Sequence, residues 1–138
     1  MLSKGQIDYM LKMMYSADVL RKELADGAVW ELIVAGNRTC GYLSYLQADD
    51  NSVKLSKIYI MREFRGRAIV TVALNRVKDY AALNGWDYVF LTVNRNNRRA
   101  IRAYEKNGFV IADSVVVDIG GGFVMDDYIM KCFVNTPQ

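Results

Sequence analysis

A short apolar run that leads through a basic turn into a long helical pattern constrains this chain more than any other stretch. The run Leu55–Met61 predicts a strand, and the charged residues after it form the turn. Helical spacing then continues to about Asn84, on a face made of Ile69, Val72, Ala73, Arg76, Val77 and Tyr80. Such a turn presents backbone N–H groups and the positive end of a helix dipole to an anion. Because Arg65 and Arg67 flank the turn, we expect a phosphate there, although an ordinary connection with solvated arginines fits the same letters.

The bulk composition limits the class of protein. At 138 residues, of which 52% are hydrophobic, the chain is long enough for one folded domain covering residues 1–138. A net charge of +3 suits an anionic ligand but is weak for a dedicated nucleic-acid binder. The arginines from 95 to 102 keep a nucleic-acid surface open as an alternative, which the weak charge and their helical setting disfavour. We therefore expect no nucleic-acid partner.

Several chemistries are excluded by what the sequence lacks. There is no histidine, which removes Ser–His and Cys–His pairs and most zinc sites, so no metal is expected. Cys40 and Cys132 lie in strand-like segments and are predicted to be buried small hydrophobes rather than a disulfide, a metal pair or a nucleophile. No stretch approaches the roughly 20 apolar residues of a membrane span, and no signal-like N-terminus is present. We expect a cytoplasmic protein without a membrane partner.

The first half of the chain predicts two helices and a hairpin. Ser3 can cap a helix whose apolar face holds Ile7, Met10, Leu11 and Met14, and Ser16 opens a second helix that ends at Ala25. Strands are predicted at 28–35 and 39–46, joined through Gly36-Asn37-Arg38, and residues 47–51 form a polar turn.

The second half predicts a central strand, a helix and another hairpin. The stretch 86–93 is almost continuously apolar and should be a central strand. Residues 98–106 form a short helix closed by Asn107-Gly108, and strands 109–119 and 123–133 flank three glycines. The order predicts a mixed α/β fold, with a mostly antiparallel sheet of about six strands, flanking helices and a right-handed crossover between Leu55 and Val93.

A second segment supports the anion site. Asn97 stands at the start of the short helix, and Tyr104 follows two turns later on the same face. A tyrosine held there can donate its phenolic proton to a leaving group. A packed helix with a core tyrosine explains this segment equally well when it is considered alone.

Together, the two segments resemble the GNAT superfamily, which transfers an acetyl group from acetyl-CoA to an amine. The resemblance covers about residues 29–133. Residues 58–69 look like the strand, turn and helix start that bind the CoA pyrophosphate. Residues 97–109, with the pattern Asn-x-x-Ala-Ile-x-x-Tyr-Glu-Lys-x-Gly-Phe, are similar to the second signature of the family. The start of the chain also resembles small bacterial members.

The resemblance implies a role for each matching residue. The strand backbone would hold the acetyl carbonyl and the pantetheine arm, and the turn would cradle the pyrophosphate. Asn97 would bond the pantetheine, and Tyr104 would protonate the departing CoA thiolate. The implied acetyl-CoA site comprises Ile58, Tyr59, Ile60, Arg65, Gly66, Arg67, Ala68, Ile69, Val70, Thr71, Asn97 and Tyr104, with Tyr104 as the catalytic acid and acetyl-CoA as co-substrate.

The sequence departs from the family at three points. Ala68 replaces a glycine, which should matter little if that residue is helical, whereas Val70 is bulkier and is expected to crowd the phosphates. Arg62 stands where a proline is common. The family's usual first strand and helix are not recognisable, so we expect a sheet one strand short or a truncated chain. A sheet edge exposed in this way would permit a homodimer.

The sequence says least about the part of the site that binds the amine acceptor. The reaction would be direct attack by a primary amine of a small molecule or peptide, and Glu31, Tyr59 and Glu63 are candidates for the base. Asp118, Asp126 and Asp127 flank the glycine turn, where they could attract a cationic amine or be solvated turn residues. The alternative function is a catalytically weakened GNAT-fold protein that binds CoA or serves in interactions.

Overall fold

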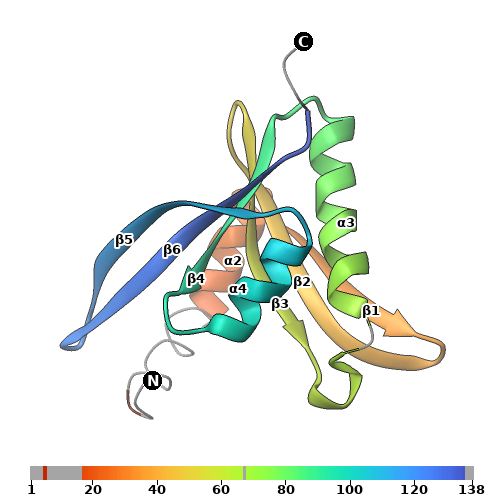
Figure 1. Ribbon diagram of the computed structural model, residues 1–138, viewed down its shortest axis with the longest axis horizontal. Coiled ribbons are helices and arrows are strands. Elements are labelled where there is room, and N and C mark those ends of the chain that lie inside the picture. Colours follow the sequence, from red (N-terminus) through yellow and green to blue (C-terminus); the bar gives the residue numbers. More distant parts are fainter. Residues whose placement is uncertain (1–4, 6–16, 67, 136–138) are drawn as a thin grey trace.

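The computed structural model describes residue 5 and residues 17–66 and 68–135, so the predicted first helix and Arg67 lie outside the described residues. Figure 1 shows the arrangement of the elements. In chain order they are α2 (Ala17–Ala25), β1 (Val29–Ala35), β2 (Arg38–Asp49), β3 (Ser52–Ile60), the 3-10 turn η1 (Arg62–Phe64), α3 (Ile69–Leu83), β4 (Tyr88–Asn94), α4 (Arg98–Lys106), β5 (Val110–Gly120) and β6 (Phe123–Phe133).

The strands form one six-stranded sheet in the order β1-β2-β3-β4-β6-β5. Every neighbouring pair is antiparallel except β3 and β4, which are parallel and are joined through α3. The prediction of a mixed, mostly antiparallel α/β sheet with flanking helices is therefore confirmed. The nearly continuous apolar strand β4 lies in the middle of the sheet, as its sequence predicted.

The helices cover both faces of the sheet, with α4 in front of the strands and α2 behind them in Figure 1. The main core lies on the side of α3 and α4, where Tyr45, Leu74, Leu91 and Met130 are almost completely buried. On the opposite face Glu23 of α2 forms an ion pair with Lys57 of β3 at 2.5 Å. Both helix layers are thus anchored on the central strands.

The buried face of α3 differs from the predicted one. The helix buries Ala73, Leu74, Val77 and Ala81, whereas Val72 is 67% exposed. Val72 and Arg76 belong to the predicted helical spacing but lie outside the buried face, because apolar residues occur almost all round this helix. Periodicity alone could not choose between two overlapping stripes, and packing against β3 and β4 decided which one is buried.

Two predicted boundaries also need correction. The polar stretch 47–51 is not all turn, because β2 continues to Asp49 and β3 begins at Ser52. Asp49 closes the tight turn by accepting hydrogen bonds from the Asn51 amide and the Ser52 hydroxyl, so the flanking polar residues can stay paired. Likewise Trp86 does not start β4. The Trp86 amide donates a hydrogen bond to Ala81 O, and the Gly85 amide donates one to Ala82 O. These two bonds form a Schellman motif, which ends α3 at the glycine that the sequence predicted.

Candidate acetyl-donor groove and strand split

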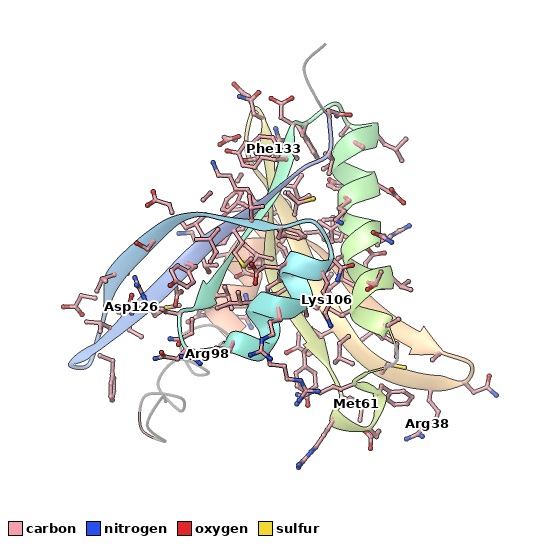
Figure 2. The ribbon with its side chains drawn as sticks, in the orientation of Figure 1. Arg38, Met61, Arg98, Lys106, Asp126 and Phe133 are labelled. Carbon is pink, nitrogen blue, oxygen red and sulfur yellow. The ribbon has the colours of Figure 1, made fainter. Side chains whose placement is uncertain are left out.

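A large groove lies between the end of β3, the start of α3 and one face of α4. Its volume is about 970 Å³. In Figure 2, Arg98 and Lys106 mark the two ends of α4, and Met61 marks the point where β3 turns into η1. All described members of the predicted site line this groove, namely Ile58, Tyr59, Ile60, Arg65, Gly66, Ala68, Ile69, Val70, Thr71, Asn97 and Tyr104. Segments about forty residues apart in sequence thus meet at one surface; their roles stay predictions.

The floor of the groove is a split in the sheet. The parallel strands β3 and β4 pair only between Ser52–Lys54 and Tyr88–Phe90. The register of β2 against β3 shifts where Tyr45 follows Ser44, so Ser56 is an extra residue that bends β3. Beyond this bulge the backbone of β3 from Ile58 to Ile60 has no β4 partner, which leaves a strand edge open to a ligand.

A second, smaller cavity occupies the split itself. It has a volume of about 180 Å³ and is lined by Leu55, Ser56, Lys57, Ile58, Leu91, Thr92 and Tyr104. Leu55 and Leu91 belong to the core on the α3 and α4 side, whereas Lys57 contacts α2 on the other side. The cavity is therefore bordered by residues of both faces of the sheet. Tyr104 borders the groove as well as this cavity, which places it at their junction.

The start of α3 offers unpaired backbone donors to the groove. Its N-cap residue is Ala68, which provides no side-chain hydrogen bond to the first turn. The amides at the start of a helix have no intrahelical partners, so those of Ile69 to Thr71 remain available to an acceptor. The side chain of Arg65 donates from Nε to Ile60 O at 3.1 Å, which ties the turn to the end of β3.

The backbone at Ala68 corrects one prediction. We expected the missing glycine to matter little if this residue is helical, but that condition is not met, because the φ of Ala68 is +59°, in the left-handed region. This conformation costs a residue with a Cβ atom roughly 1 kcal/mol of conformational free energy, whereas glycine adopts it without that cost. Val70 is half-buried and packs against the core while it also borders the groove. Its predicted crowding of the phosphates stays a prediction.

Asn97 and Tyr104 are held by α4 in different ways. Asn97 caps the helix, because its Oδ1 accepts a hydrogen bond from the Ala100 amide at 3.2 Å. The sequence placed Asn97 at the helix start without identifying this side-chain cap. Tyr104 packs against Phe109 with the ring centroids 5.9 Å apart, and burial raises the pKa of its hydroxyl above the ordinary tyrosine value of 10.0. The phenol thus stays protonated at neutral pH, as a proton donor must.

The groove has a single sign of charge. Among the described residues that line it there is no carboxylate, while five basic side chains border it, from Arg65, Arg98, Arg99, Arg102 and Lys106. The four on α4 were not among the predicted binding residues. Their spacing of three and four positions along one helix could have indicated a shared face. This surface favours a ligand with several negative charges.

The candidate bases are not brought together with Tyr104. Glu31 accepts hydrogen bonds from the Tyr45 hydroxyl at 2.6 Å and from two nitrogens of Arg76 at 2.9 and 3.2 Å. The bonds from Arg76 and Tyr45 outweigh burial and lower the pKa of Glu31. Burial and this carboxylate raise the pKa of Tyr45 to about 12. Glu31 therefore joins β1, β2 and α3 as an anion and does not line the groove.

The other two candidates also lack support as bases. Glu63 lies in η1 and is exposed, outside the groove lining. Tyr59 borders the groove but stacks on Tyr42 with the ring centroids 5.7 Å apart and is 43% exposed. Glu63 therefore does not share a surface with Tyr104, whereas Tyr59 shares the groove with it but is engaged in the Tyr42 stack.

The described part of the chain also bears on the cysteines, on metal binding and on membrane-spanning helices. Cys40 and Cys132 are buried free thiols outside the groove lining. The described residues contain no group of three or more His, Cys, Asp or Glu side chains that could hold a metal ion. No helix in that part is both long and apolar enough to cross a membrane.

Comparison with known proteins finds acetyltransferases. A family model described as the acetyltransferase (GNAT) family matches residues 6–109. An uncharacterized N-acetyltransferase of Mycobacterium tuberculosis is 34% identical over 93 residues, which cover 67% of this chain and 59% of that protein. The matched part thus spans less than two thirds of this curated relative.

Solved structures share the fold at low sequence identity. PaiA N-acetyltransferase from Thermoplasma acidophilum, in complex with coenzyme A, superimposes with a TM-score of 0.76 at 21% identity, covering 96% of this chain and 80% of that one. Spermidine N-acetyltransferase from Vibrio cholerae, in complex with CoA and spermine, gives a TM-score of 0.70 at 20% identity, covering 96% and 92% of the two chains.

Proposed function

Because this chain belongs to the GNAT acetyltransferase family, we propose that it transfers an acetyl group from acetyl-CoA to a primary amine of a small molecule or peptide. The observation that carries the proposal is the junction at Tyr104. A groove that suits a polyanion meets there a small cavity bordered by both faces of the sheet. An acetyl donor and an amine can thus reach one point from opposite sides.

The donor site follows from the groove. The pyrophosphate of acetyl-CoA binds the free amides of Ile69 to Thr71 with charge from Arg65, and the basic side chains of α4 attract its remaining negative charge. The pantetheine arm lies along the open edge of β3 from Ile58 to Ile60 and reaches Asn97. A strand N–H near Ile60 polarises the acetyl carbonyl.

The transfer step is a direct attack. The nitrogen of the neutral amine forms a bond to the acetyl carbon and gives up one proton to water, while the C–S bond of the thioester breaks. Tyr104 donates its proton to the departing thiolate and is then reprotonated from water. No acyl-enzyme is required. An aliphatic amine with a pKa near 10.4 must first lose a proton, which costs about 4.6 kcal/mol at pH 7. Since Glu31 is bound to Arg76, that proton does not pass to Glu31.

A second candidate function rests on Ala68. Its strained left-handed conformation and the neighbouring Val70 make this phosphate cradle less favourable than one built with glycines. The chain would then be a CoA-binding protein with weak or no transferase activity. The spermidine N-acetyltransferase from Vibrio cholerae, solved in complex with CoA and spermine, suggests polyamines as acceptors to include in a test.

One experiment separates the two candidates. Acetyl-CoA is titrated into the protein by calorimetry, and thiol release is then followed with a panel of spermidine, lysine and a short peptide with a free N-terminus. Binding with amine-dependent thiol release is the expected result. Binding without turnover on any amine supports the second candidate. No binding at about 1 mM acetyl-CoA would exclude both.

A further inference from the structure

Asp127 is a buried carboxylate that the proposed mechanism does not use. It lies on β6 and is only 4% exposed. Within the described part of the chain, its side chain makes no hydrogen bond and no ion pair. The adjacent Asp126 differs, because it binds Nε of Arg95 at 3.1 Å and its side chain is 48% exposed. Two neighbouring carboxylates thus have opposite environments.

The strand register places Asp127 beside the split in the sheet. It is paired with Asn94, the last residue of β4, while Thr92 is paired with Ile129. Because side chains alternate along a strand, Asp127, Asn94 and Thr92 lie on one face. Leu91 and Val93 point into the core on the other face, and Thr92 lines the small cavity. Asp127 therefore lies on the α2 face, where the acceptor approaches, at the wide end of the split.

The described basic side chains near this face already interact with groups other than Asp127. Lys57 binds Glu23, Lys131 lies 4.5 Å from the centre of the Tyr88 ring, and Arg95 binds Asp126. Burial and the neighbouring Asp126 charge raise the pKa of Asp127. A buried carboxylate for which the described residues supply no counter-ion is unfavourable for folding, so its position two residue pairs along the strands from Thr92 and the small cavity requires a reason.

We propose that Asp127 binds the ammonium group of the acceptor, which supplies the counter-ion that the described residues do not. This inference rests on the proposed function and narrows it. The site selects aliphatic primary amines, which are cationic at neutral pH, over aromatic amines, which are neutral. Of the acidic residues near the glycine turn, Asp127 alone is buried, and Asp118 and Asp126 are solvated or paired.

The test compares two charge-matched variants. Asp127→Asn and Asp126→Asn each remove one negative charge from adjacent positions. Thiol release is measured with n-butylamine, which is cationic, and with aniline, which is neutral at pH 7.5. Acetyl-CoA affinity and the melting temperature are recorded for each variant. Asp127→Asn should raise the KM for n-butylamine by about tenfold or more and leave that for aniline unchanged. Asp126→Asn should change neither.

Stability distinguishes an acceptor site from a structural role. Asparagine has almost the shape of aspartate without the buried charge, so Asp127→Asn should melt no lower than wild type. A clearly lower melting temperature, equal KM changes in both variants, or equal effects on both amines would overturn the proposal. A failure of acetyl-CoA to bind would instead remove the proposed function.

A binding measurement tests the proposal if no turnover is detected. If the wild type acetylates neither amine, n-butylamine is titrated into the protein with CoA present. Binding that is at least about tenfold weaker in Asp127→Asn supports the proposal. Equal binding, or none to the wild type, overturns it.

Discussion

The backbone of Gly41 on β2 passes so close to Tyr59 on β3 that a Cβ atom at Gly41 would lie 1.9 Å from the Tyr59 carbonyl oxygen. No real Cβ contact is that short, and the obstacle is backbone rather than a flexible side chain. We expect Gly41→Ala to destabilise the fold by about 3 kcal/mol or more and to weaken acetyl-CoA binding, because Tyr59 and Ile60 border the groove. Denaturant unfolding and calorimetry measure both effects. Thr39→Ala, an exposed change on the same strand, is the control, and a Gly41→Ala variant as stable as wild type would contradict the expectation.

Ala68→Gly should improve the phosphate cradle. The left-handed φ of Ala68 costs an alanine more than a glycine, so the variant should be more stable by up to about 1 kcal/mol and should bind CoA more tightly. Ala82→Gly, at an ordinary helical position of α3, should lose about 1 kcal/mol instead. Thermal unfolding gives the sign of each change. Equal losses in both variants would show that Ala68 is not strained.

The Glu31–Arg76 ion pair predicts a pH-dependent loss. Because the pKa of Glu31 is lowered in the folded protein, its stabilising effect is complete above the unfolded value of 4.5 and disappears as the pH falls through the folded value. Glu31→Gln should therefore lower the melting temperature at pH 7, and this difference should shrink as the pH falls below 4.5, while acetyl transfer is retained. Glu63→Gln, at an exposed position, is the matched control. Loss of transfer in Glu31→Gln with normal CoA binding would restore Glu31 as a base.

The Glu23–Lys57 pair predicts a double-mutant result. The Lys57 side chain is 3% exposed, and Glu23 holds it across 34 residues of sequence. Glu23→Gln leaves a buried ammonium poorly compensated and should cost about 3 kcal/mol. The double variant Glu23→Leu with Lys57→Met should recover most of that loss, as judged by urea midpoints. Additive losses would show that the two residues act independently.

Tyr104→Phe tests the proton donor. Removal of the hydroxyl should lower kcat about a hundredfold while CoA affinity stays nearly unchanged, because the ring still packs against Phe109. Since burial raises the pKa of Tyr104 above 10.0, its ionisation should not reduce the wild-type rate below pH 10. Steady-state kinetics and calorimetry give the two readouts. An unchanged kcat would remove Tyr104 as the acid.

Much of the site could be predicted from local patterns. The helix 98–106 was predicted with its observed bounds because a turn precedes it and Asn107-Gly108 closes it. The described residues of the turn after β3 and of α4 do meet at one groove, as their family resemblance implied. Patterns of this kind depend on neighbours within a few residues, so sequence spacing is sufficient to predict them.

Long-range features were not predictable in this way. The face of α3, the pairing of Glu31 with Arg76 and the bulge at Ser56 depend on partners in other elements, up to 45 residues away in the sequence. The left-handed conformation of Ala68 could not be predicted, because alanine has no local preference for positive φ. The tertiary connections around it impose that conformation.

The sequence alone determined the fold class, the two signature segments and Tyr104 as the candidate acid, because periodicity and short-range caps specify helices and strands one at a time. Only the tertiary structure decided which faces are buried, that β3 separates from β4 beneath Tyr104, and that Asp127 is buried whereas Asp126 is paired at the surface. The physical reason is that burial, desolvation and strand register arise between segments. The same carboxylate can be a solvated turn residue or a buried ligand group, and its own neighbours in sequence do not distinguish the two.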